Sequence, residues 1–186
     1  MHTTSSSLLL RLRQADEQTA WNRFVQLYTP LLYFWAQRWG LQNQDAADLV
    51  QEVFVTLVQK LPEFQYNPQL GFRNWLRTVA HNKWRDFGRR RGLAAAGDKS
   101  LGDVAAPEQE DALAEAEYRQ HVMSRALELM KAEFPPKMWK ACWETVVEGR
   151  SAAEVAVELE IAEGTVYVAK SRILNRLRQE LDGLLD

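Results

Sequence analysis

The chain has 186 residues, which allows one or two domains. Its hydrophobic content of 46% and charged content of 26% are typical of a folded globular protein and exclude a disordered or fibrous chain. The net charge of −2 excludes nucleic-acid binding through overall positive charge, so such a role must depend on how the charges are distributed. The single cysteine, Cys142, excludes an intrachain disulfide and a cysteine metal cluster.

The N-terminal sequence predicts neither export nor membrane insertion. Three consecutive leucines precede Arg11, which is too short for the apolar core of a signal peptide. No apolar run approaches the length needed to span a bilayer. We therefore expect a cytoplasmic protein without membrane insertion.

Two amphipathic helices are predicted before the first loop. Apolar residues recur at helical spacing from Trp21 to Trp39, and Gly40 is a plausible end of that helix. Pro30 lies within it and should kink the helix or split it in two. Residues 43–61 form the second helix, whose early acids suit the helix dipole. Its predicted buried stripe is Leu49, Val50, Val53, Phe54, Leu57, Val58 and Leu61.

Residues 72–91 combine an apolar face with a strongly basic polar face. The segment has seven arginines and lysines against Asp86 alone. In a helical projection its aromatic and aliphatic side chains share one sector, and arginines and amides lie opposite. Such a helix is suited to contact phosphates and base edges. The candidates on and after its polar face are Asn74, Arg77, Thr78, His81, Asn82, Arg85, Arg89 and Arg90.

Aromatic residues next to this polar face have two possible roles. Phe64, Tyr66 and Asn67 lie on the preceding loop, residues 62–71. The two rings could stack on an unpaired base or fold back onto the core. Trp84 falls at the edge of the apolar sector, where either the core or DNA is a possible partner.

The sequence predicts an all-α fold with two helical domains, residues 1–91 and 119–186, joined by a flexible acidic linker. The linker, residues 92–118, begins with small and polar residues, and seven acids accompany Lys99 between residues 94 and 118. Pro107, followed by acids, predicts the start of a helix that continues to about residue 132. No strand-like alternation of useful length appears.

The C-terminal domain is predicted to contain a helix-turn-helix. A short amphipathic helix ends at Gly149, and Ser151 with Glu154 has the pattern of a capping box. Residues 152–159, a turn of about four residues and a last helix to about Leu181 complete the motif.

The last helix has a buried apolar stripe and a basic polar half. Residues 164–178 contain four basic residues and no acid. In a helix-turn-helix, the first residues of the second helix reach base edges, and basic residues beyond them meet phosphates. The candidates are Glu163, Thr165, Tyr167 and Val168 for bases, with Ser171, Arg172, Arg176 and Arg178 farther along the polar half.

These motifs, in this order, resemble bacterial sigma factors of the extracytoplasmic-function (ECF) kind, in the sigma-70 superfamily. DAADLVQEVF, residues 45–54, is similar to the family's helix that docks on the clamp coiled coil of RNA polymerase. FRNWLRTVAHNKWRDFGRRR, residues 72–91, is similar to its helix for melting and reading the minus-ten element. SAAEVAVELEIAEGTVYVAKSRILNRLRQEL, residues 151–181, resembles its domain for the minus-thirty-five element.

The resemblance implies a transcription initiation factor that has no catalytic activity or cofactor of its own. The implied partners are RNA polymerase core, through its clamp and flap, promoter DNA and, as a candidate regulator, an anti-sigma protein. Asn82 would contact a promoter base, and the loop at residues 62–71 would hold a flipped base of the minus-ten element. The implied polymerase-facing residues are Asp45, Asp48, Gln51 and Glu52.

Three positions depart from the family pattern. Ala47 stands where an acid is usual, which weakens the acidic patch. Tyr167, Val168 and Ala169 replace a stretch that is commonly polar and basic. This favours apolar contact, for example with thymine methyl groups, over arginine–guanine recognition. Trp84 is bulkier than the usual aliphatic residue.

Two other classes of protein are alternatives. A stand-alone helix-turn-helix regulator with a helical N-terminal sensor would bind duplex DNA without polymerase, but the aromatics beside the basic helix favour single-stranded DNA. An enzyme is disfavoured because His2, His81 and His121 are scattered, and the chain lacks metal-ligand spacing and a glycine-rich phosphate loop. We therefore expect no metal site.

Overall fold

The computed structural model describes residues 7–14, 17–65, 71–90 and 107–185. The chain divides into two compact units. Of the described residues, those between Leu8 and Val122 and those from Gly183 to Leu185 form the N-terminal unit, and Ser7 with Met123–Asp182 forms the C-terminal unit. Every regular element in the described ranges is a helix, which confirms the all-α fold. None of the helices in these ranges has both the length and the apolar character to cross a membrane.

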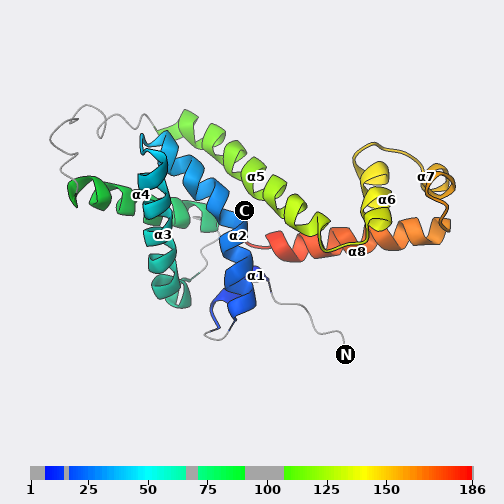
Figure 1. Ribbon diagram of the computed structural model, residues 1–186, viewed down its shortest axis with the longest axis horizontal. Helices are drawn as coiled ribbons and strands as arrows, with labels where there is room; N and C mark the ends of the chain where they lie inside the picture. The colour runs from blue at the N-terminus through cyan, green and yellow to red at the C-terminus, as the bar shows by residue number, and fades with distance from the viewer. Residues whose placement is uncertain (1–6, 15–16, 66–70, 91–106, 186) are drawn as a thin grey trace. The chain divides into compact units, whose positions relative to one another are not determined.

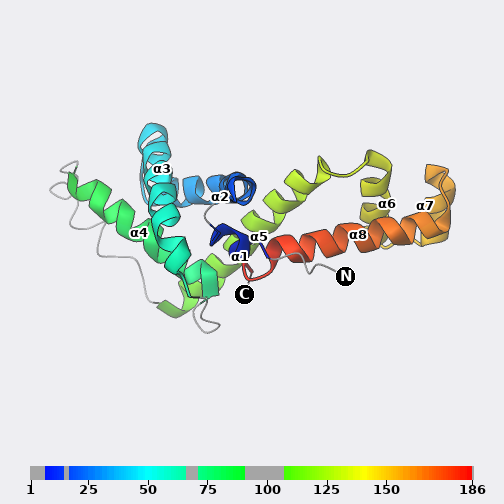
Figure 2. The same ribbon diagram turned by 90° about the horizontal axis from the view of Figure 1, so that it is seen from below.

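The core of the N-terminal unit forms where three amphipathic helices cross. Figures 1 and 2 show α2, α3 and α4 crossing one another rather than lying parallel. The rings of Phe24 and Tyr28 of α2 lie 6.0 and 5.8 Å from that of Phe72 of α4, measured between ring centroids. The elements are α1 (Leu8–Leu12), α2 (Gln18–Arg38), α3 (Asn43–Lys60), the 3-10 turn η1 (Leu61–Glu63), α4 (Gly71–Arg90) and the beginning of α5 (Pro107–Lys131).

Of the two outcomes expected for Pro30, a kink or a split, the split is excluded, and one residue of the predicted buried stripe of α3 is exposed. Pro30 does not split α2, which continues through it as one helix. Its ring lies on the exposed side, where water can solvate the carbonyl that lacks an N–H donor. Val58 is not part of the buried stripe of α3, because its side chain is 53% exposed. Gly40, with φ of +89°, follows the end of α2 as predicted.

The position of Trp84, which the sequence left open, is in the core. Its side chain is only 8% exposed, and its ring centroid lies 5.6 Å from that of Trp39. Phe64 packs against Trp75 and Phe72, with ring centroids 4.5 and 5.8 Å away, and remains half-buried. Tyr66 and Asn67 lie outside the described residues.

The first part of α5 is packed against α2. The helix begins at Pro107, as predicted, and Tyr118 is fully buried although it falls within the predicted linker. The hydroxyl of Tyr118 donates to the carbonyl oxygen of Leu184 at 2.7 Å and lies 2.8 Å from the hydroxyl of Tyr28. Because its proton is used on Leu184, Tyr118 accepts the hydrogen bond from Tyr28.

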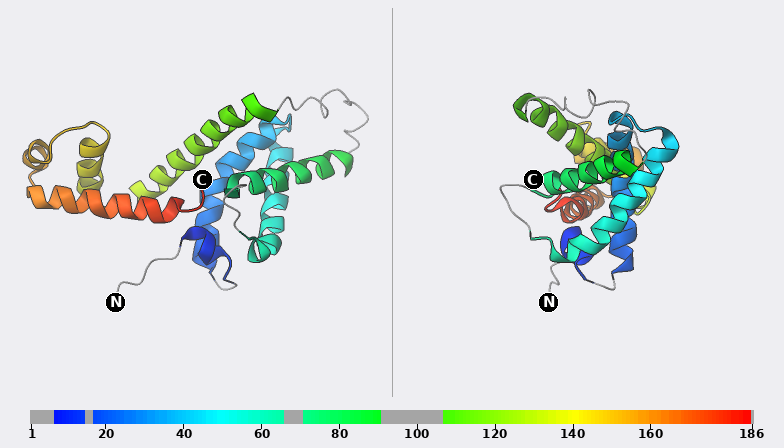
Figure 3. Two further views of the ribbon diagram at one scale, coloured as in Figure 1. Left: turned by 180° about the vertical axis from the view of Figure 1, so that it is seen from behind. Right: turned by 90° about the vertical axis from the view of Figure 1, so that its left-hand side faces the viewer.

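The C-terminal unit is built on its longest helix, α8 (Glu163–Leu181). Figure 3 shows α6 (Pro136–Val146) standing against α8, and α7 (Ala152–Leu159) beside the first turns of α8. The capping box at the start of α7 is present, with Ser151 accepting from the backbone N–H of Glu154. The buried residues shared by these helices are Ala141, Val155, Ala156, Leu159, Val166 and Ala169.

Removing the Tyr118 hydroxyl should destabilise the N-terminal unit more than removing the Tyr28 hydroxyl. Tyr118→Phe leaves both the Tyr28 hydroxyl and the Leu184 carbonyl buried without their partner, which should cost about 2–3 kcal/mol. Tyr28→Phe removes only a donor to Tyr118 and should cost about 1 kcal/mol. Urea unfolding followed by circular dichroism measures both, and equal losses would contradict the directed hydrogen-bond chain.

Candidate nucleic-acid interface

The polar face of α4 is exposed, and its opposite face forms part of the core. Phe72, Leu76, Val79, Ala80 and Phe87 are all buried. The candidate residues Asn74, Thr78, Asn82, Arg85, Arg89 and Arg90 are exposed, whereas Arg77 and His81 are half-buried. The hydroxyl of Thr78 donates to the carbonyl oxygen of Asn74 at 2.8 Å. Arg73 does not belong to this face, because its side chain is 92% buried.

His81 lies in a positive and partly apolar environment. Its ring centroid is 5.7 Å from that of Trp39 and 5.2 Å from that of Trp84. Partial burial, followed by the charges of Arg85 and Arg77, lowers the pKa of His81. The arginines therefore already carry the positive charge of this face while His81 is neutral.

A groove lined by both acidic and basic side chains runs between α3 and α4. Glu52 of α3 and Arg90 of α4 form an ion pair, with 2.5 Å between the carboxylate oxygen and the guanidinium nitrogen. A residue predicted to face polymerase thus contacts a residue predicted to face DNA. Val55, 60% exposed, also lines the groove and was missed because the pattern of α3 gave it no role. The groove, of 660 Å³, is lined by Asp48, Gln51, Glu52, Val55, Thr56, Gln59, Lys83, Phe87 and Arg90. Asp45 is in the first turn of α3 and does not line it.

The outer face of α8 presents apolar residues beside charged ones. Tyr167 and Val168 are 57% and 45% exposed, and the Tyr167 hydroxyl donates to Glu163 at 3.3 Å. Thr165, Ser171, Arg172 and Arg178 are also exposed. Arg176 is half-buried instead and forms ion pairs with Glu180 and, at 3.6 Å, with Glu133.

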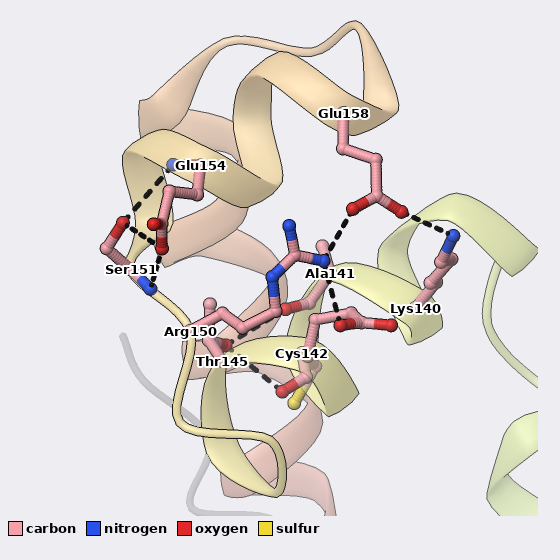
Figure 4. Close-up of polar contacts among 9 residues, drawn as sticks. Lys140, Ala141, Cys142, Thr145, Arg150, Ser151, Glu154 and Glu158 are labelled. Carbon is pink, nitrogen blue, oxygen red and sulfur yellow. Dashed lines mark hydrogen bonds and ion pairs between the residues drawn. The ribbon is translucent and has the colours of Figure 1, made fainter.

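Charged side chains connect α6, α7 and the segment between them (Figure 4). Arg150 donates to Glu144 at 3.0 Å and to Glu158 at 2.5 Å, and Lys140 pairs with Glu158 at 2.9 Å. Hydrogen bonds from Lys140 and Arg150 lower the pKa of Glu158 to about 2. Its contribution to stability is therefore present above about pH 4.5 and is lost as the pH falls through about 2. The network orients α7, which packs against α8.

A second groove, between α5 and α6, was not found by sequence reasoning. Trp139 and Trp143 stack along α6, with ring centroids 6.5 Å apart, and Trp143 is 39% exposed. The groove, of 600 Å³, is lined by Ser124, Leu127, Glu128, Lys131, Pro136, Trp139, Lys140 and Trp143. The helical spacing of the tryptophans predicts an apolar stripe on α6. It does not predict which of these side chains α5 buries and which it leaves exposed. An exposed tryptophan in a largely apolar groove is typical of a protein-binding surface.

Metal ligands do not gather in the described part of the chain. No group of three or more histidine, cysteine, aspartate or glutamate side chains there has the geometry to hold a metal ion. Cys142 is buried, and burial raises the pKa of its thiol.

The helices that form the α3–α4 groove and the basic face match a known family. Residues 24–93 fit the sequence model described as sigma-70 region 2, a segment that includes α3 and α4. The segment that contains α3 and α4 therefore carries the sequence pattern of sigma-70 region 2. The resemblance inferred from the sequence motifs is thereby confirmed.

Two individual proteins are similar to the chain. It is 28% identical over 162 residues to the ECF RNA polymerase sigma factor SigE of Mycolicibacterium smegmatis (strain ATCC 700084 / mc(2)155). The similarity covers 87% of this chain and 60% of SigE, so the chain spans less than two thirds of that relative's length. The chain is also similar to a chain in the structure of CnrH in complex with the cytosolic domain of CnrY. The two sequences are 22% identical, the TM-score is 0.38, and the match covers 91% of this chain and 92% of the other.

The charges around His81 should be visible in its titration. Replacing Arg85 with glutamine removes the larger of the two charge contributions and should raise the pKa of His81 toward 6.5, as measured by NMR. A histidine whose pKa is lowered by folding resists protonation in the folded state, so stability should decrease as the pH falls below about 6.5. This loss should be smaller in Arg85→Gln. An unchanged His81 titration would show that Arg85 does not act on it.

Proposed function

We propose that the protein is a sigma factor that directs RNA polymerase core to specific promoters and helps to melt the minus-ten element. The observation that carries the proposal is the sigma-70 region 2 match over the helices that form the α3–α4 groove and the basic face. The protein would act by binding and positioning, without catalysis of its own. It would work in the cytoplasm, where polymerase and chromosomal DNA are found.

The α3–α4 groove is the proposed docking site for the clamp coiled coil of polymerase. Asp48 and Glu52 supply negative charge, and Gln51 supplies hydrogen-bonding capacity. Val55 supplies an exposed apolar contact between these polar groups. A polar rim around apolar area is the usual composition of a protein interface. Asp45, one turn earlier on α3, would extend the negative charge beyond the groove.

The polar face of α4 is the proposed contact for the minus-ten element. Asn82 is exposed on this face, and an amide side chain can donate to and accept from a base edge. Arg77 and Arg85 lie one helical turn to either side of His81 and are suited to phosphates. Phe64 packs against the aromatic core and remains half-buried, and we propose that the exposed part of its side chain contacts a flipped base.

The α7–α8 pair is the proposed helix-turn-helix for the minus-thirty-five element. Tyr167 and Val168 project from the first two turns of α8, where a recognition helix meets base edges. Their exposure supports apolar contact with thymine methyl groups. Arg172 and Arg178 are exposed and suited to phosphates, whereas Arg176 would first have to leave Glu180 and Glu133.

The α5–α6 groove is the proposed docking site for the polymerase flap. Its support is the largely apolar lining and the exposed ring of Trp143. Lys131 lies at the same groove and would favour an apolar segment flanked by acids. An anti-sigma protein, if one regulates this chain, would act by covering one of the two grooves.

Run-off transcription tests the proposed function. Purified polymerase core, a promoter library and the full chain should yield transcripts from specific start sites that are absent when the chain is omitted. Failure to form a complex with core at low salt, together with the absence of specific transcripts, would overturn the proposal. Tight binding to specific duplex DNA without core would instead indicate a stand-alone regulator.

Charge reversal in the α3–α4 groove should weaken core binding. Asp48→Lys and Glu52→Lys should each raise the dissociation constant for core by about ten-fold or more, which is about 1.4 kcal/mol. Glu63→Lys, an exposed acid outside the groove, is the matched control and should leave the affinity unchanged. Fluorescence anisotropy with labelled chain measures the affinity, and equal effects of all three variants would exclude a specific role for the groove.

A further inference from the structure

The segment that follows α8, residues 183–185, is docked in the N-terminal unit. Leu184 is 1% exposed, and its carbonyl oxygen accepts the hydrogen bond from Tyr118 at 2.7 Å. Gly183 has a φ of +74°, and a Cβ added there would lie 3.2 Å from the Cδ1 atom of Leu9 in α1. Because α8 belongs to the C-terminal unit, the chain enters the other unit directly after this helix.

Tyr118 connects this segment to the first half of α5, which lies on α2. The Tyr118 ring stacks on that of Trp35, with centroids 6.4 Å apart and an angle of 22° between the planes. One turn later, the ring of His121 lies 4.5 Å from that of Phe34. The C-terminal unit begins within α5 and ends directly before residue 183, so both of its ends are held at the N-terminal unit.

These attachments limit how far α8 can reach from the N-terminal unit. With 19 residues, α8 is about 28 Å long, so its first turn lies no farther than about 30 Å from residue 183. The N-terminal unit itself adds a diameter of about 35 Å, as expected for roughly 100 residues. The minus-ten and minus-thirty-five elements, about 25 base pairs apart, are separated by about 85 Å. While the segment is docked, α4 and α8 therefore cannot both reach their proposed elements on straight DNA.

We propose that Tyr118 and residues 183–185 form an autoinhibitory latch, which keeps the free chain closed and must open when the chain binds polymerase and a promoter. The inference rests on the proposed function, because only a reader of two separated elements needs the open state. Burial of one leucine favours the closed state by about 10- to 100-fold. A partner that binds the open state more tightly by a larger factor can reverse this preference.

Energy transfer between two dyes tests the latch in the full chain. Glu63 and Glu148 are exposed, one in each unit, and can be replaced by cysteine for labelling in a Cys142→Ser background. Leu184→Asp should lower the transfer efficiency of the free chain, because a carboxylate is disfavoured at the buried position. Leu10→Asp is the matched control, since Leu10 is a leucine of α1 that is 53% exposed, and it should leave the efficiency unchanged.

Gly183→Ala opens the latch without introducing a charge. Alanine is strained at a positive φ and would crowd Leu9, but only while the segment is docked. The ratio of closed to open chain should therefore fall about five-fold or more. Gly40→Ala is the matched control, because Gly40 also has a positive φ, of +89°, and a Cβ there meets no atom within 4 Å. It should leave the transfer efficiency unchanged, and circular dichroism establishes that each variant is folded.

Polymerase core and promoter DNA provide a test that does not depend on opening the latch by substitution. Their addition should lower the transfer efficiency of the labelled chain with Gly183 and Leu184 intact. An efficiency that both latch variants leave unchanged, or that core and promoter leave unchanged, would overturn the proposal. If the chain nevertheless initiates from specific promoters, only this inference fails. If no specific initiation occurs, the proposed function fails as well.

Discussion

The structure of the N-terminal unit depends on the burial of one face of α4. Phe72 packs against Phe24 and Tyr28 of α2, and Phe87 is buried near the other end of the helix. A helix that buries aromatic side chains on one side must present its remaining positions to solvent. Hydrophobic burial therefore fixes the direction in which the arginines and amides of α4 point, and the proposed DNA-binding surface is a consequence of the core.

The same packing brings opposite charges together in the α3–α4 groove. Arg90 contacts Glu52 across the two helices, although one residue was assigned to DNA and the other to polymerase. The pair is substantially exposed, so it contributes little stability and can exchange partners at small cost. The proposed polymerase docking site and the proposed DNA contact consequently meet at one pair of side chains.

The C-terminal unit combines apolar packing with a charged brace outside the core. Val155, Leu159 and Val166 are buried between α7 and α8, and Arg150 with Glu158 holds α7 to α6 from outside. A fixed α7 gives α8 a defined starting direction, which a recognition helix needs. Ion pairs can also oppose a predicted role. Arg176, which the helical projection assigned to DNA, is instead paired with Glu180 and Glu133.

The sequence by itself determined the helices after α1 and the faces of α4 and α8, because three- and four-residue periodicity, the proline at the start of α5 and the capping box at Ser151 are local properties. It did not determine the burial of Trp84, the contact between Trp39 and His81, or the hydrogen bond from Tyr118 to Leu184. Each of these joins residues from different helices or from distant parts of the chain. The tertiary structure decided them because a helical projection describes one helix at a time, whereas burial and pairing depend on which other helix lies against it.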